Sequence, residues 1–301
     1  MNFKHISLIF IFFLAFVACQ NEQKHNTTDI QSTVHRDSGV RQPEQNLNIS
    51  FLLDLSDRID PKKYPNDAMA YYKRDAAYIK SVAGAFRNHL NSKKIRQINE
   101  KIQVFFEPEP SNPEINEISE KLKFNFSRHN ISKDLLETFD HNYRTYPTQI
   151  YNLAIEDNNY IGSDTWRFFK TNIQDYCVEE GYRNVLVIMT DGYIFHKDTK
   201  IKEENRTSYL TPEYIRSVGL NSNNWIDRYK ENNFGYINLD KDLSNLEILV
   251  LGINPDPKND YEEEVIRKYW SDWLENMNVK RYKIMNADLP SNMEEIIKDF
   301  I

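Results

Sequence analysis

Apolar runs along the chain predict the strands of a sheet. The run at 184–189 is continuous rather than alternating, which indicates burial on both faces and therefore a central strand of a parallel sheet. Runs at 47–55 and 246–253 predict two further buried strands. Shorter patterns predict strands at 101–106 and 122–126, and a last strand at 280–285 lies at an edge.

Apolar positions spaced three and four apart predict helices between these strands. The predicted helical segments are 68–90, 115–122, 134–139, 148–156, about 163–180, 262–277 and 293–301. Strands that alternate with helices over some 250 residues predict one α/β domain at 47–301, with a doubly wound, mostly parallel, Rossmann-like sheet flanked by helices.

Residues 193–245 are polar and irregular, which is too long for an ordinary connection between a strand and a helix. We interpret this stretch as an insertion after the central strand, with at least one helix at 223–231. The aromatic row Tyr269, Trp270 and Trp273 on the following helix is expected to pack against the sheet.

The first residues have the pattern of a secretory signal, with an apolar stretch too short for a comfortable membrane span. We predict a signal peptide at 1–18 and, because 19–46 is polar, a flexible tether there. The sequence Phe16-Val17-Ala18-Cys19 resembles a bacterial lipobox, although Leu is usual at the position of Phe16. The resemblance implies lipidation of Cys19 and a cell-envelope protein; Gln20 in place of Asp favours the outer membrane. An ordinary signal peptide or an uncleaved anchor is the alternative.

Charge and composition exclude several functions. The formal net charge of −7 gives no electrostatic case for binding nucleic acid, which usually requires a basic patch. Neither of the common phosphate-binding glycine patterns occurs, and no His or Cys spacing is typical of a zinc site. The second cysteine, Cys177, is best explained as a small buried residue, and His196 as an exposed loop residue.

Oxygen-bearing side chains follow two strands and precede one helix. Asp54 and Ser56 end the first strand, Asp191 ends the central strand, and 163–165 precede the long helix. In a doubly wound sheet these positions line one crevice. Two carboxylates with two or three hydroxyls suit Mg²⁺ or Ca²⁺, and hydroxyl ligands leave such an ion able to take a carboxylate from a partner protein. The plainer alternative is that Asp54 and Asp191 are turn and cap residues.

At these residues the chain resembles the von Willebrand factor type A (VWA) domain over about 47–301. The metal-ion-dependent adhesion site of that family has Asp-x-Ser-x-Ser after the first strand, a Thr in a later loop and an Asp in a Thr-Asp-Gly turn. The resemblance implies that Asp54, Ser56, Thr165 and Asp191 are metal ligands.

Two features depart from that pattern or leave it open. Arg58 stands where the family has its second Ser, and a guanidinium has no lone pair with which to bind a metal. Beside Asp54 and Asp191, Arg58 could replace the metal by an ion pair, or it could bend away. Thr148, before another helical segment, competes with Thr165 as the ligand.

The sequence therefore predicts a lipid-anchored envelope protein whose VWA-like domain binds another protein, through a divalent cation or without one, and which is not an enzyme. A metal-free structural component of an envelope assembly is an alternative. A hydrolase or phosphatase that uses Asp54 is another alternative, although phosphatases of the haloacid-dehalogenase type need a second Asp where this chain has Ser56.

Overall fold

The computed structural model describes residues 45–160 and 162–301. The predicted signal peptide at 1–18, the lipidation site Cys19 and nearly all of the tether at 19–46 lie outside these residues. No helix in the described part of the chain combines the length and the apolar character needed to cross a membrane.

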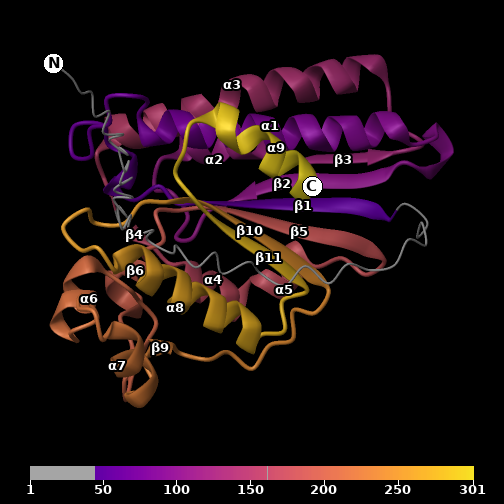
Figure 1. Ribbon diagram of the computed structural model, residues 1–301. Helices are drawn as coiled ribbons and strands as arrows, with labels where there is room; N and C mark the ends of the chain where they lie inside the picture. The colour runs from indigo at the N-terminus through magenta and orange to yellow at the C-terminus, as the bar shows by residue number, and fades with distance from the viewer. Residues whose placement is uncertain (1–44, 161) are drawn as a thin grey trace, which may run out of the picture. The chain divides into compact units, whose positions relative to one another are not determined.

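The central sheet contains six of the described strands in the order β11-β10-β5-β1-β2-β3 (Figure 1). Their bounds are β1 Asn46–Leu53, β2 Asn99–Phe105, β3 Phe124–Ser127, β5 Tyr182–Met189, β10 Leu246–Ile253 and β11 Arg281–Asn286. Every neighbouring pair is parallel except β2 with β3. The prediction of a mostly parallel α/β sheet is confirmed, and all six predicted strands are present.

Helices cover both faces of this sheet (Figure 1). One face carries α1 Tyr71–Ser92, α2 Pro113–Glu120, α3 Lys133–Asp157 and α9 Pro290–Phe300. The other face carries α4 Thr165–Thr171, α5 Ile173–Cys177 and α8 Glu262–Asn276. Among the described residues, three short 3-10 helices connect elements: η1 Asp57–Ile59, η2 Ile95–Gln97 and η3 Lys197–Thr199.

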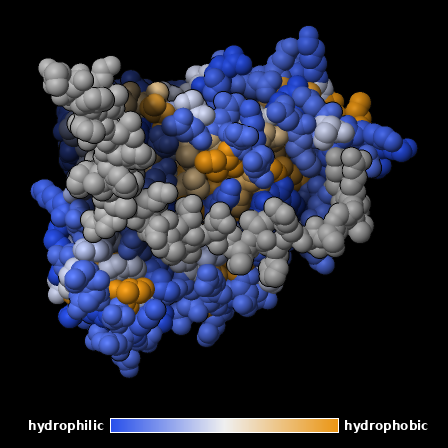
Figure 2. All heavy atoms as spheres, in the orientation of Figure 1, coloured by the Kyte–Doolittle hydropathy of each residue, from blue (hydrophilic) through white to orange (hydrophobic). Residues whose placement is uncertain are grey.

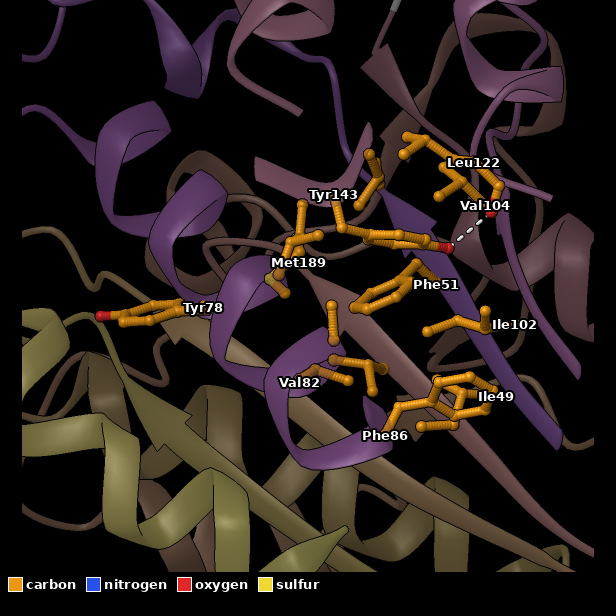
Figure 3. Close-up of a cluster of buried hydrophobic side chains, with 14 of the residues drawn as sticks. Ile49, Phe51, Tyr78, Val82, Phe86, Ile102, Val104, Leu122, Tyr143 and Met189 are labelled. Atoms are coloured by element: carbon orange, nitrogen blue, oxygen red, sulfur yellow. Dashed lines mark hydrogen bonds between the residues drawn. The ribbon is translucent and has the colours of Figure 1, made fainter. Parts of the chain in front are cut away.

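A separate hydrophobic core lies on each face of the sheet, because the buried strands send alternate side chains to opposite sides. Phe51 and Val187 belong to the core under α1 and α3, which Figure 3 shows in part. Leu52 and Ile188, their neighbours along the chain, belong to the other core.

The aromatic row of α8 packs in the core, as predicted. Tyr269, Trp270 and Trp273 are at most 1% exposed. The Trp270 indole N–H donates to the carbonyl oxygen of Gly192 at 2.9 Å, which ties α8 to the turn after β5.

The stretch between β5 and β10 is more regular than its composition suggests. It contains α6 Pro212–Ser217 and α7 Trp225–Glu231, which agrees with the helix predicted at 223–231. Its short strands are β6 Phe195–His196, β7 Lys202–Glu203, β8 Arg206–Thr207 and β9 Gly235–Tyr236. The ring centroids of Tyr236 and Trp273 are 5.1 Å apart, so aromatic contacts with α8 order this stretch.

Two helix predictions need correction. The segments predicted at 134–139 and 148–156 form one helix, α3, with Pro147 buried inside it. Buried Tyr143 and Tyr151 lie on either side of this proline, and their packing outweighs the lost hydrogen bond. The helix predicted at about 163–180 is instead divided at Asn172 into α4 and α5.

The strand order brings the ends of β1 and β5 together. From β1 the chain adds β2 and β3 on one side, then returns to place β5 on the other side of β1. The direction of winding therefore reverses between β1 and β5, which is where open α/β sheets form a crevice.

The face seen in Figure 2 is mostly hydrophilic, with its apolar side chains gathered mainly near the centre, about α9.

Candidate functional site

The first strand and the central strand bring Asp54 next to the turn that carries Asp191. The backbone N–H of Asp54 donates to the carbonyl oxygen of Met189 at 3.1 Å, which continues the β1–β5 pairing past the last strand residue. The Thr190 hydroxyl then donates to Asp54 Oδ2 at 3.4 Å. Two of the predicted site residues, Asp54 and Asp191, are thus brought to the same crevice.

Both oxygens of the Asp54 carboxylate have neighbours. Oδ1 accepts a 2.8 Å hydrogen bond from the backbone N–H of Ser56, which fixes the turn into η1. Oδ2 lies 3.4 Å from Arg58 Nε as well as from the Thr190 hydroxyl. Ser56 precedes η1 and is half-buried, and its side chain makes no capping hydrogen bond. Its hydroxyl is therefore not required to hold the turn.

Arg58 lies between two carboxylates. Its side chain is 5% exposed, with Nη2 2.5 Å from Asp75 Oδ2 on α1. Burial opposes the guanidinium charge, but Asp75 and Asp54 outweigh this effect and hold the pKa of Arg58 above its ordinary value. Arg58 was predicted to lie beside Asp54 and Asp191, but its closest partner is Asp75, which was not among the predicted site residues.

A sequence signal for Asp75 did exist. Helix α1 buries Tyr78, Ile79 and Val82, and Asp75 lies one turn before them on the same face. An acidic residue on the apolar face of a helix is uncommon unless it is paired. Burial raises the pKa of Asp75 even though Arg58 acts in the opposite direction.

Asp191 is the least compensated carboxylate at these strand ends. Its Oδ1 accepts from the backbone N–H of Tyr193 at 3.1 Å, and its carbonyl oxygen accepts from the N–H of Asn254 at 2.9 Å. Burial and the charge of Asp54 raise the pKa of Asp191 to about 7, against the opposing effect of Arg58. The Asp191 carboxylate is therefore destabilised in its charged form.

Thr165 belongs to a second group of polar residues. It is the first residue of α4, is 1% exposed, and has its Oγ1 3.4 Å from Ser163 Oγ. Within the described part of the chain, no hydrogen bond joins Thr165 to Asp54, Ser56 or Asp191. Thr148 lies inside α3 rather than before a helix, so it lacks the helix-start position on which its candidacy depended.

Asp164 is the centre of this second group. Asp164 is the N-cap of α4, and its Oδ1 accepts a hydrogen bond from the N–H of Arg167 at 3.0 Å. Its Oδ2 accepts from the Thr199 hydroxyl at 2.5 Å and lies 3.6 Å from His196 Nδ1. The expectation that His196 is exposed was wrong. His196 is buried, with only 7% of its surface exposed, because β6 pairs with β4 (Gly162–Ser163).

Gly162 makes this pairing possible. Its φ is +94°, and a Cβ at this position would lie 2.2 Å from the carbonyl oxygen of Phe195. Only glycine allows both the backbone conformation and the close approach of β6. The loop that carries 163–165 is thus positioned by a backbone contact with the segment after β5.

A divalent cation does not fit the strand-end residues as they are arranged. The guanidinium of Arg58 carries a permanent positive charge 3.4 Å from Asp54 Oδ2. A second cation beside it would meet strong repulsion at a buried position. Among the described residues, no group of three or more His, Cys, Asp or Glu side chains is arranged to hold a metal ion.

Comparisons with known proteins do not assign the chain to a family. No protein-family model matches it, and no curated protein is detectably similar in sequence. The pilus adhesin SpaC of Lactobacillus rhamnosus GG has a TM-score of 0.39 and 11% identity over 86% of this chain and 30% of the adhesin. Proximal thread matrix protein 1 of the mussel byssus has a TM-score of 0.34 and 10% identity, over 85% and 48%. The chain spans less than half the length of either protein, and similarity at this level carries no argument about function.

Proposed function

We propose that this chain is a lipid-anchored protein of the bacterial cell envelope whose VWA-like domain binds another protein at the ends of β1 and β5, without a metal ion. The observation that carries the proposal is the position of Arg58, which brings a positive charge to the carboxylates of Asp54 and Asp75 where the family resemblance implies a cation. The order of the strands, which reverses at this point, also supports a VWA-like fold.

The chemistry of the strand ends favours binding over catalysis. A nucleophilic Asp54 would need access to a substrate, but the residue is only 3% exposed, and both of its carboxylate oxygens contact neighbouring groups. Asp191 and Ser56 are instead half-buried, and they follow the neighbouring strands β5 and β1. They offer a carboxylate and a hydroxyl with which a protein partner can form hydrogen bonds.

Capture from envelope membranes tests the binding surface. The full chain in detergent is used as bait in three forms: wild type, Ser56→Arg, which blocks the strand ends, and Ser291→Arg, a matched change at an exposed position on α9. The proposal expects one partner that is retained by wild type and Ser291→Arg and lost with Ser56→Arg. Equal capture by all three forms would place the interaction elsewhere and overturn the proposal.

Calorimetric titration tests whether a metal takes part, and so decides the expectation of Mg²⁺ or Ca²⁺. Wild type is expected to give no binding heat with Mg²⁺, Mn²⁺ or Ca²⁺, whereas Arg58→Ser, which restores the family motif, is expected to gain binding. Binding by wild type that disappears in Asp54→Ala and Asp191→Ala would overturn the metal-free form of the proposal.

The lipid anchor is tested separately. Cys19→Ser is expected to move the protein from the membrane fraction to the soluble fraction and to abolish labelling by a radioactive fatty acid. Unchanged labelling would show that Cys19 is not the lipidated residue.

A further inference from the structure

Strand β2 is longer than the strand that covers its outer edge. The pairing of β2 with β3 runs from Asn99 opposite Ser127 to Ile102 opposite Phe124 and ends there. The carbonyl oxygen of Ile98 accepts from the N–H of Arg128 at 3.1 Å, so even-numbered residues turn their backbone groups toward β3. Val104 is the next such residue, and it lies beyond the start of β3.

The residue that would continue the pairing is occupied elsewhere. Leu122 would stand opposite Val104, but its N–H donates to the carbonyl oxygen of Ser119 at 2.9 Å. Its own carbonyl oxygen accepts from the Tyr143 hydroxyl at 2.6 Å (Figure 3). No described residue bonds the N–H or C=O of Val104 on this side, nor those of Phe106. The end of β2 is therefore an open sheet edge.

Val104, Phe105 and Phe106 at this edge line a groove of about 1160 Å³, together with Lys101 and Gln103 earlier on β2. The groove is bordered by α2 on one side and by α4 and α5 on the other. Tyr176 of α5, which is 47% exposed, stacks on Phe105 with ring centroids 5.0 Å apart and an angle of 15° between the rings. An aromatic surface beside an open edge suits the side chains of an extended segment.

The groove carries an excess of negative charge. Two of its acidic residues are neutralised internally, Glu179 by Lys101 at 2.7 Å and Glu107 by Arg167 at 3.6 Å. Four more acidic residues are exposed and have no Lys or Arg at salt-bridge distance in the described part of the chain. They are Glu109, Glu117, Glu120 and Asp175, against a single basic residue of this kind, Lys123. A partner segment rich in Lys or Arg complements this charge.

We infer that the open edge of β2 binds an extended segment of a partner protein, in which Lys or Arg alternates with apolar residues, by adding it to the sheet as a strand. Backbone groups of Val104 and Phe106 pair with the segment. Its basic side chains meet the acidic residues of α2, and an apolar side chain packs on Tyr176. This surface is distinct from the strand ends at Asp54 and Asp191, and the inference goes beyond the function proposed above.

Labelled peptides test this inference by fluorescence anisotropy with the full chain in detergent. The probe is a peptide of about eight residues in which Lys alternates with Val, which extends to about 26 Å as one strand. Two control peptides have Glu in place of Lys, or N-methyl groups on alternate residues so that one backbone edge cannot pair. We expect the Lys peptide to bind, with affinity that falls as ionic strength rises from about 0.05 to about 0.5 M, and both controls to bind about tenfold more weakly or less.

Protein variants test the edge itself. Val104→Pro removes the N–H that points away from β1, a change that an edge strand tolerates, and Val104→Ala loses similar packing but keeps the N–H. We expect about tenfold weaker binding by Val104→Pro and wild-type binding by Val104→Ala. Glu117→Gln with Glu120→Gln should weaken binding and reduce its salt dependence.

Several results would overturn the inference: no binding of the Lys peptide by wild type, equal binding of either control peptide, or wild-type binding by Val104→Pro. If Val104→Pro does not fold, binding of the N-methylated peptide to the wild-type chain tests the backbone pairing instead. Light scattering measures self-association. If Val104→Ala still self-associates and the Lys peptide does not displace the second copy, the edge is assigned to a second copy of this chain, and the inference of a partner segment is rejected. Ser56→Arg should leave peptide binding unchanged, so that this inference and the proposed function fail independently.

Discussion

Buried carboxylates lie at both ends of the parallel strands, and the two ends neutralise them differently. At the amino end, Glu247 has Arg183 Nη2 at 2.9 Å and Arg281 Nη2 at 2.7 Å. Glu100 contacts Lys93 and His89. Burial acts to raise the pKa of each glutamate, but these partners outweigh it and hold both pKa values below the ordinary range.

At the carboxyl end, three carboxylates share one cation. Asp54 and Asp75 contact Arg58, and Asp191 interacts with it only at longer range. The pKa values of Asp75 and Asp191 are raised, chiefly by burial. Negative charge at this end is therefore only partly compensated.

The difference separates a stabilising end from a candidate binding end. Well-compensated carboxylates add to the stability of the folded state at neutral pH, whereas poorly compensated ones reduce it. Charged groups held at such a cost cluster at functional sites. This contrast supports the strand ends at Asp54 and Asp191, rather than the opposite end of the sheet, as the candidate site.

The largest expected effect comes from removing Arg58. Arg58→Met leaves Asp54 and Asp75 buried without their cation, so unfolding in urea at neutral pH should show a loss of about 3–5 kcal/mol. Arg87→Met is the matched control, because the contacts of Arg87, with Asp140 at 3.5 Å and with Asn91, are at least partly exposed, so the variant should lose less than about 1 kcal/mol. Equal losses in the two variants would mean that Arg58 does not compensate the strand-end charges.

Glu247→Gln tests the amino end and should destabilise the protein by about 1–3 kcal/mol at pH 7. Because the folded-state pKa of Glu247 is lowered, its stabilisation is present above the unfolded pKa of about 4.3 and is lost as pH falls through the folded pKa. The difference between wild type and variant in urea unfolding should therefore shrink below about pH 4. A difference in stability that stays constant in acid would show that Glu247 does not stabilise the protein through its charge.

Asp191→Asn should have the opposite sign. Because the folded-state pKa of Asp191 is raised to about 7, the folded protein binds its proton more tightly than the unfolded chain does. Wild type therefore loses stability as pH rises from about 4 to 7, and the variant lacks this loss. The asparagine keeps an oxygen for the N–H of Tyr193.

At pH 8 the Asp191→Asn variant should be more stable than wild type by about 1–2 kcal/mol, with little difference near pH 4. Thermal unfolding at the two pH values measures this. A variant less stable than wild type at pH 8 would show that Asp191 is compensated like the glutamates at the amino end.

The fold was largely predictable because burial on both faces leaves an unbroken apolar run, as at 184–189. The proximity of Asp54 and Asp191 was predictable for a related reason, since the carboxyl ends of neighbouring parallel strands meet at one edge. The partner of Arg58 was not found, because it depends on how α1 packs against η1. The open end of β2 was also missed, since it depends on Leu122 bonding to Tyr143 instead of continuing the sheet.

Ser56→Ala is expected to have the smallest effect on stability, and it tests directly whether Ser56 belongs to the binding surface. The Ser56 hydroxyl makes no capping hydrogen bond, while the backbone N–H of Ser56 still donates to Asp54 in the variant. The free energy of unfolding should therefore change by less than about 0.5 kcal/mol. If Ser56 belongs to the binding surface, the captured partner should nevertheless bind more weakly. A stable variant with unchanged partner affinity would leave Asp191 to carry the contact, whereas a loss of more than about 1 kcal/mol would make Ser56 part of the scaffold.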